Sequence, residues 1–458
     1  MKYVSKHYLV YSVFCIASLG LLSAHGQPQP PVQPAAYVAT AWADMTVQTM
    51  TGAMKNTPTY GSRALGYLGL AMHESLAAGT RKHRSIARSL CDTLRLPVPN
   101  RSLTYCPELA LNAGQAYLLT ALYRYTRHTE RIDSLADAIH RHYAARYSPQ
   151  VVARSERFGL AVAEKLYQWS LTDGGHQAQE RNFPVDYVVL TGTGCWTVPL
   201  IGQAVTKVPM HPYWGTNRLF VRQNGQLPIP RPLPFSTDSA SEFYQQNQEV
   251  WHRNQQLTSE ERATVLWWGD DPNLTCAPPG HSYYLATAAI RQSQADLAKA
   301  AQTYCRVGLA VADAFVVCWK VKFAHLIERP SSYVASVMQP PTNTRWYPFF
   351  PEPPFPSFYS GHAVQSAATA TVLTDLYGDA FTFTDDLHVG RPALRYYLYL
   401  NNGYTQSFTP RTYPSFWDAA RECAESRLLG GIHTRQDNEV GLQEGAKIGA
   451  HVNNLPWR

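Results

Sequence analysis

The sequence predicts an all-α fold: a large helical bundle with one long Pro/Gly-rich loop segment. Apolar residues recur at helical spacing through most of the 458 residues, and turn-forming residues separate these stretches. The chain is 45% hydrophobic and 12% aromatic, which is enough for one large core. We therefore expect an N-terminal helical region, residues 37–235, and a C-terminal helical region, residues 236–458, to form one compact domain together.

The helical pattern predicts most elements of this bundle. Ser148-Pro149 is typical of a helix start, and Thr258 opens a capping box with Glu261. The expected helices in the N-terminal region are residues 35–55, 60–78, 107–125, 129–146 and 149–171. In the C-terminal region they are 238–256, a helix opened by Thr258, 283–301, 302–328, 362–377, 414–429 and 438–453.

The first residues have the pattern of a targeting segment. Lys2 and Lys6 precede an apolar run from Tyr8 to Leu22, and small residues follow up to Gly26. This predicts a signal peptide, residues 1–26, followed by a Pro-rich linker, residues 27–36, and hence a secreted or periplasmic protein. A membrane anchor is the alternative, but the run is short for a span.

Charge and hydropathy exclude two classes of partner. The formal net charge is +7. Removal of the predicted signal peptide would take away the charges of Lys2 and Lys6. No basic tract with interleaved aromatic residues is present, so we expect no nucleic acid, and a mild positive charge suits small anions. The longest later apolar stretch, residues 307–319, is interrupted by Asp313, so no membrane span is expected after signal cleavage.

Eight cysteines are present, and seven remain after residue 26. This number is too small for a disulfide scaffold but notable in an oxidising compartment. Cys91 and Cys106 bracket a loop, which makes them the expected disulfide pair, and the odd count leaves at least one free thiol.

The segment from about Pro184 to Ser236 interrupts the helices. It is rich in proline, glycine and aromatic residues, including Gly192 and Gly194 before Cys195 and Trp196. Long loops inside compact domains are usually functional or packed over an active site. The glycines lack the strand and helix that frame a nucleotide-binding fingerprint.

Chemistry is concentrated in the loop that ends in Ser360-Gly361-His362. Small and flexible residues at the start of the helix that follows leave backbone N–H groups open to an oxyanion or a phosphate, with His362 at the edge. Ordinary N-capping by Ser360 is the alternative interpretation.

Two further blocks carry cations and a histidine. Lys322 and Arg329 stand seven residues apart, which predicts one helix face, and Pro330 is expected to end that helix. Downstream, Arg427 precedes a Gly-Gly break and His433. Asp437 follows His433 by four residues, a spacing that lets its carboxylate fix the tautomer of the ring.

The order K-x6-R-P, S-G-H, S-R-x5-H-x3-D resembles the superfamily shared by vanadium-dependent haloperoxidases and type 2 phosphatidic acid phosphatases. The strict resemblance covers about a quarter of the chain, and Tyr359 stands where the family usually has proline. The resemblance implies a helical bundle of the vanadium haloperoxidase type. It also implies that an oxyanion, vanadate or phosphate, is bound by Lys322, Arg329, Ser360, Gly361 and Arg427.

The resemblance leaves two roles open for the histidines. In a haloperoxidase the cofactor is vanadate, His433 is the single protein ligand to the metal, and His362 handles the protons of peroxide. The partners are then hydrogen peroxide, a halide and an organic acceptor. In a phosphatase there is no cofactor, His433 becomes a phosphohistidine, and His362 protonates the leaving group.

Three residues outside the shared blocks bear on this choice. Trp319 lies one turn before Lys322, as in vanadium chloroperoxidases, and Phe355 stands where bromoperoxidases are expected to carry a second histidine. Together they predict an apolar wall for a halide, although ordinary core packing is the alternative. Asp270 lies in a segment similar to the one that, in vanadium haloperoxidases, supplies a carboxylate to an active-site arginine. The alternative interpretation of Asp270 is that it belongs to an Asp-Asp-Pro turn that ends a helix.

We favour the haloperoxidase interpretation because the chain lacks the several spans of membrane lipid phosphatases and has a longer N-terminal bundle than small acid phosphatases. A soluble secreted acid phosphatase is the alternative, and a noncatalytic oxyanion-binding protein is a third. The sequence does not specify the preferred halide, the organic substrate or the oligomeric state.

Overall fold

The computed structural model describes residues 33–51, 53–80, 83–126, 128–199, 202–272, 274–338, 346–391, 394–397 and 403–457. Residues 35–458 form one compact unit. The predicted signal peptide, residues 1–26, lies outside the described residues, as do residues 27–32 of the predicted linker.

Helices dominate the N-terminal region. A cap at Ser148, followed by proline at the first helical position, begins α6 as the sequence predicts. Thr57 and Pro58 begin α2 in the same way, two residues before the predicted start. The helices are α1 (Tyr37–Met50), α2 (Pro58–Ser75), α3 (Ala87–Leu90), α4 (Pro107–Leu122), α5 (Thr129–Ala144) and α6 (Pro149–Ser170).

The C-terminal region is also helical. The predicted capping box of Thr258 and Glu261 begins α8, and a second capping box, Thr434 with Asp437, begins α14. The helices are α7 (Glu242–Gln255), α8 (Ser259–Trp267), α9 (Ala277–Gln292), α10 (Leu297–His325), α11 (Pro330–Tyr333), the π-helical turn η4 (Val334–Met338), α12 (Gly361–Tyr377), α13 (Phe416–Leu429) and α14 (Arg435–Asn453).

Three predicted boundaries in this region are wrong. Helix α9 begins at Ala277 rather than at residue 283. The break between α9 and α10 falls at residues 293–296 rather than after residue 301, because the Asp296 side chain caps α10 by accepting a hydrogen bond from the Lys299 N–H. Helix α10 ends at His325, where Leu326 takes a left-handed conformation with φ 53°. Arg329 therefore does not continue the face of Lys322, and Pro330 begins α11 instead of ending α10.

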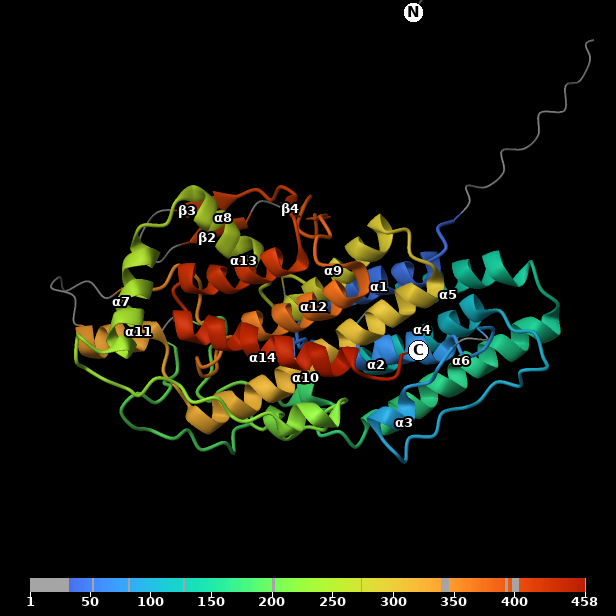
Figure 1. The fold of residues 1–458 in the computed structure, drawn as a ribbon, viewed down its shortest axis with the longest axis horizontal. Coiled ribbons are helices and arrows are strands. Elements are labelled where there is room, and N and C mark those ends of the chain that lie inside the picture. The colour runs from blue at the N-terminus through green and yellow to red at the C-terminus, as the bar shows by residue number, and fades with distance from the viewer. Residues whose placement is uncertain are drawn as a thin grey trace, which may run out of the picture. The chain divides into compact units, whose positions relative to one another are not determined.

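Helices α12 and α14 pack closely against each other along one seam of the bundle (Figure 1). Three glycines of α14 face α12 at intervals of four residues: Gly441, Gly445 and Gly449. A Cβ atom at Gly445 would lie 2.2 Å from the Val364 carbonyl oxygen, a distance that no side chain tolerates. Glycine at these positions therefore lets the two helix backbones meet directly.

Among the described residues between α12 and α13 there are four short strands. Strand β1 (Phe383–Asp385) pairs antiparallel with β4 (Arg411–Tyr413), and β2 (Leu394–Tyr397) pairs antiparallel with β3 (Gly403–Gln406). The first pair places Asp385, which is buried, opposite Arg411.

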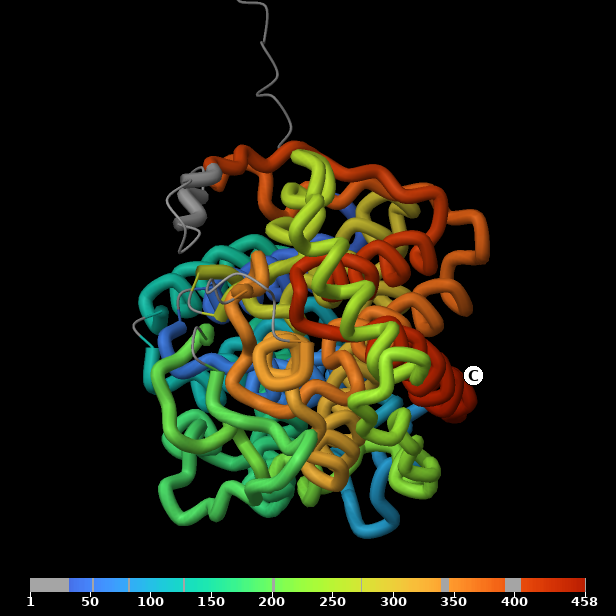
Figure 2. The backbone as a smooth tube through the Cα atoms, turned by 90° about the vertical axis from the view of Figure 1, so that its left-hand side faces the viewer, coloured from blue at the N-terminus to red at the C-terminus, as the bar shows by residue number. Residues whose placement is uncertain are grey.

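The Pro/Gly-rich segment packs against the loops that precede α11 and α12. Its described residues form the short 3-10 turns η2 (Trp214–Thr216) and η3 (Arg222–Gln226), and η1 (Ala178–Glu180) precedes them. Isolated β-bridges join Cys195 to Ile327 and Gly202 to Glu352. In Figure 2 this green segment accordingly runs beside the orange chain. The long loop thus packs over the region that the motifs mark.

The predicted bridge between Cys91 and Cys106 is wrong, because both thiols are free. The Cys91 sulfur lies 3.2 Å from the Thr93 hydroxyl, whereas the Cys106 thiol donates to the Glu108 carboxylate over 3.3 Å. Each sulfur therefore has a local partner near its own residue. Among the helices of the described residues, none has both the length and the apolar character needed to cross a membrane.

Candidate active site

The predicted oxyanion residues come from five stretches of chain. Lys322 lies in the last turn of α10, Arg329 caps α11, Ser360 and Gly361 begin α12, and Arg427 lies in the last turn of α13. His433 follows the Gly430-Gly431 break, where Gly431 adopts φ 83°. This left-handed turn suits glycine and reverses the chain after α13, as the sequence predicts.

Hydrogen bonds show that these stretches meet. An Arg329 Nη1 group donates to His433 Nε2 over 3.1 Å, and the Ser360 N–H donates to the Asp437 carbonyl over 3.0 Å. The same contacts bring α11, α12 and the start of α14 together at one end of the α12–α14 seam.

His433 is held as a neutral imidazole with a defined tautomer. Its Nδ1 lies 2.8 Å from the Asp437 carboxylate, as the four-residue spacing predicts, and so Nδ1 carries the proton and donates it. Nε2 then has a lone pair, which accepts from Arg329. Burial, and next the Arg329 charge, lower the pKa of His433 to about 3. A neutral nitrogen with an available lone pair is what either a metal ligand or a nucleophile requires.

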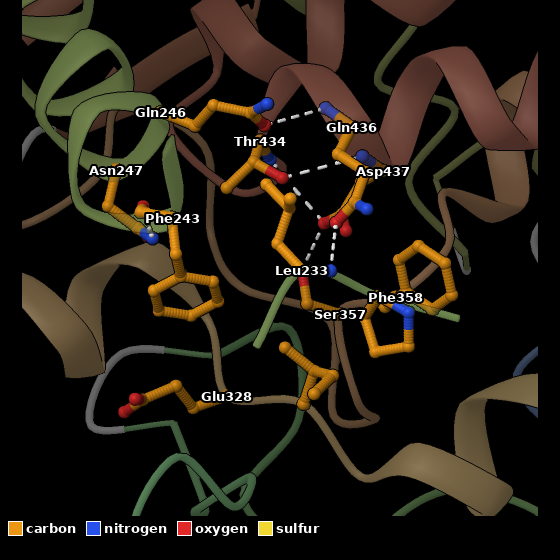
Figure 3. A pocket seen from close by; sticks show the side chains of 12 residues that line it. Leu233, Phe243, Gln246, Asn247, Glu328, Ser357, Phe358, Thr434, Gln436 and Asp437 are labelled. Carbon is orange, nitrogen blue, oxygen red and sulfur yellow. Dashed lines mark hydrogen bonds between the residues drawn. The ribbon is translucent and has the colours of Figure 1, made fainter. Parts of the chain in front are cut away.

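Ser357 completes this arrangement, although no role was predicted for it. Its hydroxyl donates to the Asp437 carboxylate and lies 3.3 Å from His433 Nδ1. A small pocket lies behind these groups and is lined in part by Ser357, Thr434 and Asp437 (Figure 3). No sequence pattern marks a serine in a proline-bounded loop as a partner of a distant aspartate and histidine.

Two of the cations are anchored by backbone carbonyls. The Lys322 ammonium donates to the carbonyls of Pro356 and Ser357 over 2.8 and 2.6 Å. Arg329 donates to the Phe355 carbonyl from Nε and Nη2 over 3.2 and 2.9 Å, and to the Ile432 carbonyl over 2.9 Å. Burial lowers the pKa of Lys322 to about 7 and that of Arg329 to about 10.

Arg427 is fully buried and is held by the end of its own helix and by α8. Its Nε donates to the Ser426 hydroxyl and its Nη2 to the Val265 carbonyl, each over 3.0 Å, and its guanidinium lies 4.8 Å from the centre of the Phe350 ring. Three guanidinium or ammonium groups thus lie in a dry site together with a neutral histidine. A tetrahedral oxyanion is the ligand that compensates such a cluster, so the residues fit vanadate and phosphate alike.

Ser360 has both of the predicted roles available to it. Its hydroxyl oxygen caps α12 by accepting from the Ala363 N–H over 3.3 Å, which is the capping alternative. The hydroxyl proton is not used in that bond, so the group can still donate to an anion.

His362 is the second histidine near the predicted oxyanion site. This site of Lys322, Arg329, Ser360, Gly361 and Arg427 is called the cradle below. Its Nε2 atom is buried and has no hydrogen-bond partner within the described part of the chain. Desolvation, and next the Arg427 charge, hold the pKa of His362 well below its usual value, while the Asp270 carboxylate acts in the opposite direction. The neutral imidazole is therefore ready to accept a proton.

Trp319 and Phe355 form the predicted apolar wall. Their ring centres lie 4.8 Å apart, and both Lys322 and Arg329 lie 5.3 Å from the centre of the Phe355 ring. The Trp319 ring also faces the Cα of Gly361. The Trp319 indole donates to the Met210 carbonyl, so the long loop fixes this wall.

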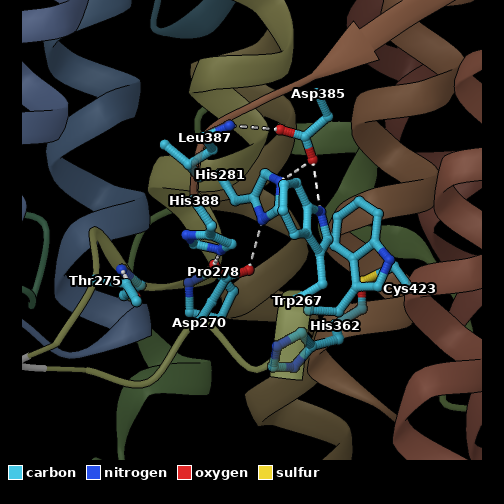
Figure 4. A network of polar contacts seen from close by, with 12 residues as sticks. Trp267, Asp270, Thr275, Pro278, His281, His362, Asp385, Leu387, His388 and Cys423 are labelled. Carbon is cyan, nitrogen blue, oxygen red and sulfur yellow. Dashed lines mark hydrogen bonds and ion pairs between the residues drawn. The ribbon is translucent and has the colours of Figure 1, made fainter. Parts of the chain in front are cut away.

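The predicted contact of Asp270 with an arginine is absent from the hydrogen bonds of the described residues. The Asp270 carboxylate accepts from His281 Nδ1 over 2.8 Å and from His388 Nε2 over 3.0 Å (Figure 4). At the turn of Asp270, which has φ 44°, the carboxylate thus meets one histidine of α9 and one in the turn that follows β1. Neither histidine was singled out from the sequence, because each reaches Asp270 only through the fold.

Comparisons with known proteins agree with this geometry. The family described as the VCPO second helical-bundle domain matches residues 302–456. The vanadium chloroperoxidase of Curvularia inaequalis is 26% identical over 221 residues, which is 39% of this chain and 36% of that protein, so the match spans about a third of that relative's length.

Solved structures extend the similarity to nearly the whole chain. The crystal structure of the first bacterial vanadium-dependent iodoperoxidase is 28% identical and covers 93% of this chain and 97% of that chain, with a TM-score of 0.78. A holo-type bacterial vanadium-dependent chloroperoxidase is 14% identical, covers 87% and 92%, and has a TM-score of 0.64, which supports the fold. The predicted all-α bundle is thereby confirmed, and the chain is similar to vanadium haloperoxidases along nearly its whole length.

Proposed function

We propose that this chain is a vanadate-dependent haloperoxidase that uses hydrogen peroxide to oxidise a halide to a hypohalous species, which then meets an organic acceptor. The observation that carries the proposal is a set of buried cations: Arg329 contacts His433 Nε2, the Lys322 charge also acts on His433, and the Arg427 charge acts on His362. When bound there, vanadate supplies the activation of peroxide that halide oxidation needs.

The residues of the chain perform the remaining tasks. Lys322, Arg329 and Arg427, with the Ser360 hydroxyl and the Gly361 N–H, bind and orient the oxyanion through charge-assisted hydrogen bonds. Asp437 holds the proton on His433 Nδ1 at 2.8 Å, which leaves Nε2 as the one metal ligand from the protein. His362 accepts and returns a proton at its unpartnered Nε2.

The wall of Trp319 and Phe355 favours the haloperoxidase over the phosphatase. A halide is poorly hydrated and suits an aromatic surface next to the Lys322 ammonium, whereas a phosphate ester would need polar partners for its leaving group. We further propose a secreted or periplasmic location, on the basis of the signal-peptide pattern of residues 1–26.

One sample tested in two ways decides between the activities. Apo-protein given orthovanadate and peroxide is expected to halogenate a phenolic reporter only when halide is present. Added phosphate is expected to inhibit competitively, since both oxyanions need the same three cations.

The alternatives predict different results for the same sample. Fast hydrolysis of phosphate esters, with halide oxidation no faster than that of free vanadate, would replace the proposal by the phosphatase alternative. Tight binding of vanadate and phosphate with neither activity would identify a noncatalytic oxyanion-binding protein.

A further inference from the structure

A second buried cluster of titratable side chains lies beside the cradle. It consists of Asp270, His281, Asp385 and His388, each at most 2% exposed. His281 lies between the two carboxylates: its Nδ1 is 2.8 Å from Asp270 and its Nε2 is 2.7 Å from Asp385 (Figure 4). The Trp268 ring stacks on His281 with a centre distance of 4.5 Å.

Both nitrogens of His281 face a carboxylate oxygen, so both must carry protons if both contacts are hydrogen bonds. His281 is then an imidazolium. Burial opposes the charged form, but Asp270 and next Asp385 outweigh it and raise the pKa of His281 to about 10. Trp267 Nε1 and the Leu387 N–H supply further donors to Asp385.

His388, unlike His281, carries a proton on only one ring nitrogen. Arg391 Nη1, which always carries protons, lies 2.9 Å from His388 Nδ1, so this nitrogen is the acceptor. His388 Nε2 must then carry the proton that it donates to Asp270 over 3.0 Å.

The side chains of Asp270, His281 and His388 also lie close enough together to bind a metal ion. A metal at His388 Nε2 would displace that proton to Nδ1, where it would oppose Arg391. The network without a metal satisfies every side-chain nitrogen and oxygen of the four residues, because none of them is left without a partner. We therefore favour a proton-bound network over a metal site.

We propose that His281 is a positioning residue, a buried imidazolium that holds the Asp270 carboxylate ionised and fixed where its charge acts on His362. This inference rests on the proposed function, in which His362 moves a proton. Within that function, His281 and His388 take the place of the arginine that the resemblance implied as the partner of Asp270.

Other charges also act on His362, and they come from the elements around it. Arg427 of α13 opposes protonation of His362, as does the charged His281, whereas Asp270 favours it; His433 is neutral and adds no charge. Asp270 is thus the one carboxylate among the groups that act most strongly on His362. Loss of its fixed position is expected to lower turnover without weakening the oxyanion cradle.

The first test compares His281→Gln with His73→Gln. Glutamine cannot carry a charge between two carboxylates. His73 is a matched control because it too is buried, its Nε2 lies 3.1 Å from the Arg84 carbonyl, and burial lowers its pKa to about 4, so it is neutral. For His281→Gln we expect vanadate affinity within about twofold of wild type and turnover lower by about tenfold, the effect of about one charge-assisted contact. For His73→Gln we expect both unchanged.

The charged clamp is the His281 imidazolium between the Asp270 and Asp385 carboxylates. The pH dependence of the free energy of unfolding distinguishes this charged clamp from a neutral His281 that only packs in the core. Because the pKa of His281 is raised in the folded state, its contribution is complete below about pH 6.5, the usual histidine value, and is lost as the pH rises toward about 10. The destabilisation by His281→Gln should therefore shrink across this range, and that by His73→Gln should not. Wild-type protein at neutral pH should show both ring N–H protons of His281 by nitrogen-15 NMR, so the charge is testable even if the variant fails to fold.

Several outcomes would overturn the inference. These are wild-type turnover in His281→Gln, a pH-independent stability loss, a single ring proton on His281, or a stoichiometric divalent cation in purified wild type that His281→Gln loses. If wild type reconstituted with vanadate shows no halide oxidation, the proposed function fails, while the NMR and stability measurements still decide whether the charged clamp exists.

Discussion

The two buried charge clusters differ in how their charges are compensated. In the network, the His281 imidazolium lies between the Asp270 and Asp385 carboxylates, and each charge has an opposite partner within 2.8 Å. In the cradle, Lys322 and Arg329 donate mainly to backbone carbonyls, which carry no net charge.

This difference identifies the ligand site without reference to any motif. A buried cation held by carbonyls alone retains most of its desolvation penalty, so it stabilises an incoming anion strongly. A compensated network gains nothing from a ligand. Both clusters are equally dry and equally polar, so burial and polarity alone would not distinguish them.

The largest expected effect is that of His433→Ala, which removes the only coordinate or covalent bond to the oxyanion. We expect loss of vanadate binding by calorimetry and loss of activity under either chemistry. The stability contribution of the network should be unchanged. Unaltered vanadate affinity would exclude His433 from the cradle and leave three cations without a central ligand.

Arg329→Lys tests whether the cradle works by geometry or by charge alone. A lysine keeps the charge but cannot reproduce the paired donors of Arg329, which span the Phe355 carbonyl, the Ile432 carbonyl and His433. Loss of one charge-assisted contact corresponds to roughly 1.5–3 kcal/mol, or about one to two decades in vanadate affinity. Affinity within about twofold of wild type would mean that charge alone suffices.

The lowered pKa of Lys322 predicts that anion affinity falls with rising pH. In the anion-free protein the pKa is about 7, and a bound anion raises it, so binding takes up a proton above that value. Sulfate, whose charge does not change in this range, should bind with a Kd that increases above pH 7 by up to about tenfold per pH unit. Lys322→Arg should flatten this dependence, since guanidinium stays charged; an identical slope would place the titrating group elsewhere.

Phe355→His is expected to have the smallest effect, a change in halide preference toward bromide of a few fold. Phe355 contacts the cradle through its ring face, while its carbonyl binds Arg329, so the substitution alters the wall and leaves the cation anchor intact. Relative rates with chloride, bromide and iodide measure it. Unchanged ratios would show that this wall does not contact the halide.

The sequence predicted the helical bundle from its apolar periodicity. Its resemblance to a known superfamily named the residues of the candidate oxyanion site, and among them the spacing of His433 and Asp437 reflects local geometry. The four-residue step from His433 to Asp437 places the carboxylate at the ring, and Gly431 provides the turn before it. Local patterns of this kind survive folding with little change.

What the sequence did not predict depends on contacts between distant segments. The break between α9 and α10 depends on an aspartate cap, and the left-handed turn at Leu326 releases Arg329 from the helix. The partners of Asp270 come from α9 and from His388, which is 118 residues away. No spacing rule connects such residues, so a resemblance suggested an arginine where the fold provides two histidines.

The carbonyls that hold Lys322 and Arg329 belong to the main chain of residues 355–357. A main-chain acceptor keeps its position whichever side chain its residue carries. The cradle is therefore insulated from variation in the side chain of residue 355, and halide selectivity can diversify among descendants of this scaffold while anion capture is inherited unchanged.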